Sequence, residues 1–277
     1  GLTGAFAARN YFAIWSNLKT QHLANDGDLA HAAQFLNARE ENANSIYVSA
    51  MHHQHPTMAY LAEEYESIKW LRGARALAIP ADGSALYLFP QSAQPPSEWI
   101  SEWKSALTYA PLDPLGNIDF QAYYFDHVGA IPQPEFQDVY ANFGNIAKLT
   151  GFRIVAAQTG QPLLVDLRLH VLSPLPDGDY RLVADLLDAW GYPWVQSFNE
   201  SYPAEQWREG ENIFVRLEIP LPNGIPPGEY MLASTLYSPS NYHNLPALDS
   251  DGRTTAAALV GPLQLSGTIN QTMTSEP

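Results

Sequence analysis

The sequence predicts two unlike domains. We expect an α/β domain with a small, mostly parallel sheet in residues 1–134, followed by an antiparallel, jelly-roll-like β-sandwich in residues 135–277. In the first half, helix-like and strand-like runs alternate. Near residues 132–145 the helical periodicity stops, and short alternating runs between Gly- and Pro-rich turns follow. A length of 277 residues also suits two domains.

Helical periodicity appears three times in the first half. Apolar residues recur every three or four positions from Asp28 to Leu36, which predicts a helix with Asp26 or Asp28 as its cap. Pro56 suits the first turn of a second helix that ends near Tyr65, and Ser97 could cap a third. Short apolar runs predict strands at residues 45–49, 68–71, 85–89 and 120–125.

The second half reads as a series of strands. Alternating apolar residues predict strands at residues 163–171, 180–187, 213–219 and 230–236. Turn-forming residues fill the segments 174–178, 222–224 and 226–228. Strands punctuated in this way predict an antiparallel sandwich.

Charge and composition exclude several classes of function. The chain carries 14 Lys and Arg against 29 Asp and Glu, a net charge of −15. Without a basic face in either half, we expect no nucleic-acid partner. The absence of cysteine excludes disulfides, thiolate zinc sites and cysteine nucleophiles. The longest apolar run, Thr254–Leu265, is shorter than the roughly 18–20 residues that a membrane helix needs.

A histidine-rich loop follows the strand expected at residues 45–49. It contains His52, His53 and His55, in the position past a strand's carboxyl end where α/β proteins often bind ligands. Adjacent residues rarely all point at one ion, and no HExxH spacing is present. We therefore expect a solvated loop with one structurally bonded histidine and no native metal. No GxSxG, Walker or GxGxxG pattern occurs either, so we predict no catalytic residue and no cofactor.

Aromatic residues are concentrated in the second half. Flat aromatic faces stack on sugar rings, so a sandwich that exposes several of them would suit a saccharide. The alternative is that these rings cap the core. The candidate ligand-binding residues are Trp190, Tyr192, Trp194, Tyr237 and Tyr242. Gly191 and Pro193 suggest that the first three lie on a surface turn between two strands.

Several short segments together resemble one family. The first is residues 9–15, which read Arg-Asn-Tyr-Phe-Ala-Ile-Trp and match an "xYFxxW" pattern. The others are residues 149–152 ("LxGY"), 179–188 ("dYxvfvhLld"), 207–211 ("WxxGE"), 227–230 ("PPGxY") and 236–237 ("GLYdp"). In order and spacing they resemble the C-terminal region of bacterial multi-pass membrane glycosyltransferases of the dolichyl-phosphate-mannose-mannosyltransferase-like, family 39 type.

The resemblance implies an accessory role. In such enzymes the catalytic acid lies near amino-terminal membrane helices, so this region would be extracytoplasmic, attached to a membrane-spanning part of the same polypeptide, and not catalytic alone. It would contribute recognition of a glycan or acceptor. Two departures weaken that expectation: Ser238 stands where the family often has Asp, and Phe198-Asn199 where an acid often precedes the proline-rich stretch.

A second class of function stays open at this point. The chain could be a free-standing secreted enzyme, a metal-dependent hydrolase that uses the histidine-rich loop. The gene sequence upstream of Gly1 would separate the two, because only an accessory region would follow a series of apolar spans.

Overall fold

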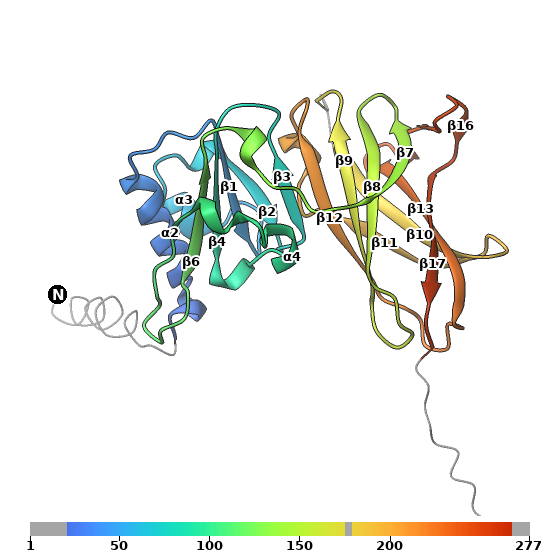
Figure 1. The fold of residues 1–277 in the computed structure, drawn as a ribbon, viewed down its shortest axis with the longest axis horizontal. Coiled ribbons are helices and arrows are strands. Elements are labelled where there is room, and N and C mark those ends of the chain that lie inside the picture. The colour runs from blue at the N-terminus through green and yellow to red at the C-terminus, as the bar shows by residue number, and fades with distance from the viewer. Residues whose placement is uncertain (1–20, 175–178, 268–277) are drawn as a thin grey trace, which may run out of the picture. The chain divides into compact units, whose positions relative to one another are not determined.

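The computed structural model describes residues 21–174 and 179–267 and is mostly β, with several open sheets (Figure 1). The contacts divide the chain into two units, Gly1–Pro134 and Glu135–Pro277. Within the described ranges, no helix combines the length and the apolarity that crossing a bilayer requires.

The first unit is built on one mixed sheet. Its strand order is β2-β1-β4-β6-β5. Strand β1 pairs in parallel with β2 and β4, whereas β6 is antiparallel to both β4 and β5. The strands are β1 (Ser45–Ala50), β2 (Ile68–Arg72), β4 (Ala85–Pro90), β5 (Leu107–Tyr109) and β6 (Phe120–Phe125).

The mixed pairing differs from the mostly parallel sheet expected from the sequence. The connection from β4 to β5 returns the chain in the same direction, since both strands are antiparallel to β6, as a crossover of a dozen or more residues allows. The helix expected after Ser97 is broken into α4 (Ser97–Ile100) and a 3-10 turn, η6 (Trp103–Ala106). The chain then enters β5 and turns back into β6 as a hairpin, which sets the antiparallel direction.

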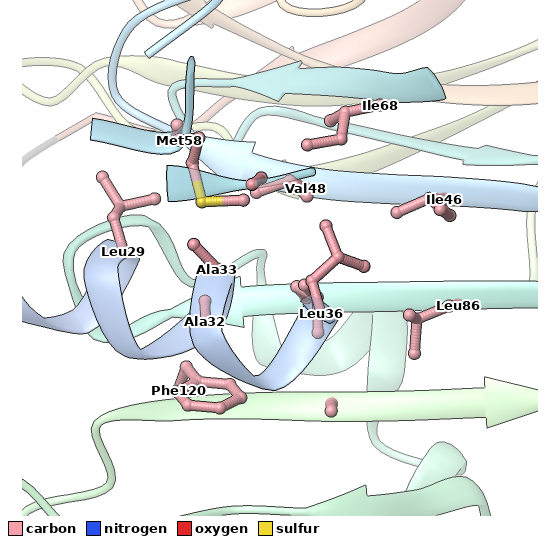
Figure 2. Packing of buried hydrophobic residues seen from close by; sticks show 14 of the residues in the cluster. Leu29, Ala32, Ala33, Leu36, Ile46, Val48, Met58, Ile68, Leu86 and Phe120 are labelled. Atoms are coloured by element: carbon pink, nitrogen blue, oxygen red, sulfur yellow. The ribbon is translucent and has the colours of Figure 1, made fainter. Parts of the chain in front are cut away.

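Helix α2 (Gly27–Ala38) covers one face of this sheet. Its buried apolar residues are Leu29, Ala32, Ala33 and Leu36, the stripe that the periodicity predicts. They pack on Ile46 and Val48 of β1 and on Phe120 of β6, with Met58 of α3 (Pro56–Leu61) beside them (Figure 2). Of the two expected caps, Asp26 is the N-cap residue, although its side chain makes no bond to the helix end, and Asp28 lies inside the first turn.

Aromatic residues cover the opposite face. Trp103 of η6 is fully buried, and its ring lies 4.8 Å from that of Tyr87 and 5.1 Å from that of Phe125. Its indole N–H donates to the Pro132 carbonyl at 2.9 Å. The remaining elements of this unit are β3 (Ala76–Ile79), which the sequence analysis missed, and the 3-10 turns η3 (Leu23–Asn25), η4 (Tyr65–Ser67), η5 (Gln91–Ala93) and η7 (Val128–Ala130).

The second unit is sandwich-like, with two antiparallel sheets. One contains β11, β10 and β13 in that order, with β14 and β17 both pairing with β13. The other runs β16-β15-β7-β8-β9-β12. The first sheet's strands are β10 (Arg181–Asp188), β11 (Pro193–Asn199), β13 (Gly228–Ser238), β14 (His243–Asn244) and β17 (Ala258–Leu265). The second sheet's are β7 (Gln137–Phe143), β8 (Ala147–Ala156), β9 (Leu163–Val171), β12 (Asn212–Ile219), β15 (Ala247–Leu248) and β16 (Thr254–Thr255).

Alternation along the strands builds the core of this unit. Every second residue of β9, from Leu163 to Val171, is fully buried, and Ile213 to Ile219 of β12 repeat the pattern. A period of two places these side chains on one face. A 3-10 turn, η8 (Ala204–Gln206), lies between β11 and β12. The expected turn at residues 174–178 lies mostly outside the described residues.

Candidate functional site

The histidine-rich loop follows β1, but its three histidines have different environments. His55 is buried and is the N-cap of α3, where its Nδ1 accepts the Thr57 amide at 3.4 Å. His52 is exposed, and its ring lies 6.2 Å from that of His55. His53 is half-buried. The loop therefore holds one histidine with a helix-capping role, and its three side chains differ in exposure.

The candidate aromatic residues separate into two places on the second unit. Trp190, Tyr192 and Trp194 lie at the turn between β10 and β11. Tyr237 and Tyr242 lie at the other end of β10, where Arg181 pairs with Tyr237. The seven residue steps from Arg181 to Asp188 span roughly 23 Å at 3.3 Å per residue. One small ligand cannot contact both places.

Asp188 fixes the backbone of the aromatic turn. Its Oδ1 accepts the amides of Trp190 and Tyr192, both at 2.9 Å, and its Oδ2 accepts the Trp194 indole N–H at 3.1 Å. These bonds favour the charged carboxylate and hold the pKa of Asp188 below its usual value. The bond from the Tyr192 amide contributes most, and those from the Trp194 indole and the Trp190 amide contribute less. Gly191 supplies the positive φ of 79° that the turn requires.

The rings of this turn project outward. The exposed fraction is 93% for Trp190 and 64% for Tyr192, whereas Trp194 is half-buried. The Tyr192 and Trp194 rings meet edge to face, with centroids 6.3 Å apart. We define this aromatic hairpin as residues 188–194. It presents two large apolar rings to water on a backbone held by the Asp188 carboxylate and by main-chain bonds of Asp188 to Tyr192 and Gly191.

An aspartate also bonds to the backbone and side chains at the other end of β10, near Tyr237 and Tyr242. Asp179 accepts the Ser238 hydroxyl at 2.7 Å and the Ser240 amide at 2.6 Å, and these bonds lower its pKa. Tyr242 is 83% exposed, and Tyr237 is half-buried. Of the candidate rings, this end therefore exposes one strongly, against two at the aromatic hairpin.

A cluster that the sequence analysis did not find lies in the first unit. Among residues 21–174 and 179–267, one group of potential metal ligands is close enough to share an ion: His22, His31 and Asp119, whose ligand atoms lie within 4.8 Å of one another. His22 Nε2 lies 2.6 Å from Asp119 Oδ1, and His31 Nδ1 lies 2.5 Å from Oδ2. We call these three residues the His–Asp–His cluster.

The strand ends position this cluster. Asp119 directly precedes β6, whose first residue, Phe120, pairs with Pro90 at the carboxyl end of β4. The Gln91 amide donates to the Asp119 carbonyl at 2.7 Å. The N-terminal end of α2 is attached to the same edge, because Asp28 accepts the Ser92 amide at 2.8 Å. His31 follows one turn along that helix.

A groove adjoins the cluster. It has a volume of about 440 Å³, and its lining includes His31 and Phe35 of α2, Tyr109 of β5 and Phe120 of β6. The rings of Phe35 and Tyr109 stack with centroids 5.2 Å apart. The groove is therefore mostly apolar, with the His31 imidazole among its polar groups.

The sequence alone gives little indication of this cluster. His22 and His31 are nine positions apart and Asp119 is a further 88 along, so no local spacing joins them. The nearest local feature is Gly27, the first residue of α2. A side chain there would overlap the His22 ring, since an added Cβ would lie 2.2 Å from two ring atoms.

Compared with known proteins, the sequence matches no family model and no curated protein.

Proposed function

We propose that the second unit binds neutral glycans through the aromatic hairpin, as an extracytoplasmic accessory region of a membrane glycosyltransferase. The observation that carries the proposal is the exposure of Trp190 and Tyr192 on a turn whose backbone Asp188 holds in place. The resemblance of the strand motifs to family 39 glycosyltransferases supports the same proposal.

Rigid exposed rings suit a sugar ligand. A saccharide ring presents axial C–H groups that pack on an aromatic face, and a fixed turn loses little conformational entropy on binding. Stacking of a nucleobase on an aromatic ring contributes on the order of 1–3 kcal/mol, and we take that as the upper range for a sugar.

Two such contacts correspond to weak binding. A dissociation constant of 1 mM equals about 4 kcal/mol, which two exposed rings supply. Weak affinity suffices for a tethered domain, because a short linker gives effective concentrations in the millimolar range. Binding to a neutral ligand should also be independent of salt, since no charge pair forms.

The test is a titration of the chain with neutral oligosaccharides, followed by NMR. We expect shifts of the Trp190 and Tyr192 amides and of the tryptophan indole signals, equal at 50 and 500 mM NaCl. Trp190→Ala and Tyr192→Ala should each weaken binding without unfolding the unit, because both side chains project into water. Trp194→Ala is a poorer variant, since the Trp194 indole also bonds to Asp188.

Two control variants make the test specific. Phe198→Ala removes another exposed ring, on β11 outside the hairpin, and should leave binding unchanged. Tyr242→Ala probes the other aromatic end. Loss of binding in Tyr242→Ala but not in Trp190→Ala would show that the glycan binds at the Tyr242 end and not at the aromatic hairpin. The absence of any NMR shift with neutral oligosaccharides at 20 mM would refute glycan binding.

The extracytoplasmic placement of this region is tested by a separate experiment. In cells that express the full-length protein, we expect an externally added protease to digest this region while cytoplasmic markers stay intact. Protection of the region in intact cells, with digestion only after lysis, would refute its extracytoplasmic placement.

A further inference from the structure

We propose that the His–Asp–His cluster of the first unit is a zinc-binding site, with His22 Nε2, His31 Nδ1 and Asp119 as its ligands. This goes beyond glycan binding, which concerns the other unit. The expectation of no metal arose from the histidine-rich loop, and the cluster shares no residue with that loop.

The charge of Asp119 is the first reason. Its side chain is fully buried, and both carboxylate oxygens face histidine nitrogens. Among the described residues, these two histidines are its only ion-pair partners, and neither lysine nor arginine pairs with it. A buried carboxylate is costly unless a cation compensates it. A divalent ion shared by two neutral imidazoles and this carboxylate provides that compensation.

The set of donor atoms is the second reason. Two imidazole nitrogens and one carboxylate oxygen form a common ligand set for zinc, with bonds of about 2.0–2.2 Å. Ligands at the corners of such a tetrahedron are roughly 3.3 Å apart. The two nitrogen–oxygen distances, 2.6 and 2.5 Å, are those of direct hydrogen bonds. When one carboxylate oxygen ligates the ion, the histidine bonded to that oxygen must withdraw from it by less than about 1 Å, and all three ligand atoms must settle about 3.3 Å apart. They already lie within 4.8 Å of one another.

The two histidines differ in their freedom to make that movement. His31 has a side chain that is 46% exposed, on the surface of α2, so it can shift with little change in packing. His22 is buried and its ring lies against Gly27, whose amide donates to the His22 carbonyl at 2.8 Å. The absence of a side chain at Gly27 is what leaves space for this ring.

The groove gives the ion a route to solvent. Three protein ligands leave the fourth position of a tetrahedral ion for water or another small ligand, as in zinc sites that exchange ligands. His31 is both a proposed ligand and part of the groove lining. The open position is therefore expected to be reachable from the groove beside Phe35 and Tyr109.

The test uses the tag-free, chelator-treated chain. Isothermal titration with Zn²⁺ should give one tight equivalent, and Co²⁺ should give the intense visible absorption of a four-coordinate site. His31→Gln should lower the affinity at least roughly tenfold, since it removes a ligand. This variant is chosen because its side chain is partly exposed, and circular dichroism should confirm that it is folded.

Matched variants separate this site from surface histidines. His52→Gln and His127→Gln each remove an exposed histidine elsewhere and should bind zinc like the wild type. Asp119→Asn should weaken binding if it remains folded. The proposal is overturned if the wild type takes up no tight equivalent, if His31→Gln binds as well as the wild type, or if His52→Gln loses the binding.

Discussion

Asp166 on β9 lies opposite Arg216 on β12, and one guanidinium contacts both of its carboxylate oxygens. Arg216 Nε donates to Oδ1 at 2.7 Å, and Nη2 donates to Oδ2 at 2.9 Å. Arg153 of β8, opposite Asp166 on its other side, adds a third bond at 2.6 Å. Asp166 is fully buried, so a single carboxylate holds two cations across three strands.

Asp166→Asn should destabilise the second unit strongly. The neutral amide removes the charge that both partly buried guanidiniums contact, and loss of one partner from a buried ion pair costs about 3 kcal/mol. We expect a loss of that order in the free energy of unfolding, measured by urea denaturation. Asp138→Asn is the control, because that side chain is almost fully exposed, 3.6 Å from Arg168, and should change little. Equal effects of the two substitutions would show that the bonds of Asp166 to Arg153 and Arg216 do not stabilise the second unit.

Gly27→Ala should disturb the first unit. The added Cβ would lie 2.2 Å from ring atoms of buried His22, so the ring must move away from Asp119. We expect a lower melting temperature and, if the cluster binds zinc, weaker zinc affinity. Gly129→Ala is a close control, since its Cβ would lie 3.3 Å from the ring of exposed His127, which can move into water. If Gly27→Ala leaves the melting temperature unchanged, the stability of the first unit does not depend on the position of the His22 ring.

The aromatic hairpin should loosen in acid. Bonds from the Tyr192 amide and its neighbours lower the pKa of Asp188 in the folded state, so its stabilising effect is present above the unfolded pKa of about 3.9. That effect is lost as the pH falls through the lower, folded value. NMR signals of the Trp190 and Tyr192 amides should therefore titrate with a midpoint below 3.9. The transition should be absent in Asp188→Asn, and a midpoint above that value would show that the bonds do not persist in solution.

Leu36→Ala should create a cavity between α2 and the sheet. Leu36 is 1% exposed and belongs to the cluster drawn in Figure 2. Truncating a buried leucine costs about 2–5 kcal/mol, which chemical denaturation of the first unit would detect. Gln34→Ala, on the exposed side of the same helix, should stay within about 0.5 kcal/mol of the wild type. If both variants lose the same free energy of unfolding, the packing of α2 on the sheet does not stabilise the first unit as the structure indicates.

Local patterns determined most of the elements. The stripe from Leu29 to Leu36 predicts α2, and the alternation from Leu163 to Val171 predicts β9, because each period places apolar side chains on one face. The change of period near residues 132–145 lies where the contacts divide the chain. Gly191 and Pro193 likewise place the aromatic residues at a turn between strands.

Tertiary structure decided strand direction, pairing and the long-range cluster. Periodicity does not show whether a strand runs parallel or antiparallel. The sequence therefore predicts a mostly parallel sheet, whereas β6 pairs antiparallel with β4. Nor does periodicity show that Asp119 meets His22 and His31, because their proximity depends on how α2 and β6 pack at the end of β4. A sequence pattern records neighbours along the chain, whereas this cluster exists only once residues 88 and 97 positions apart are brought together by folding.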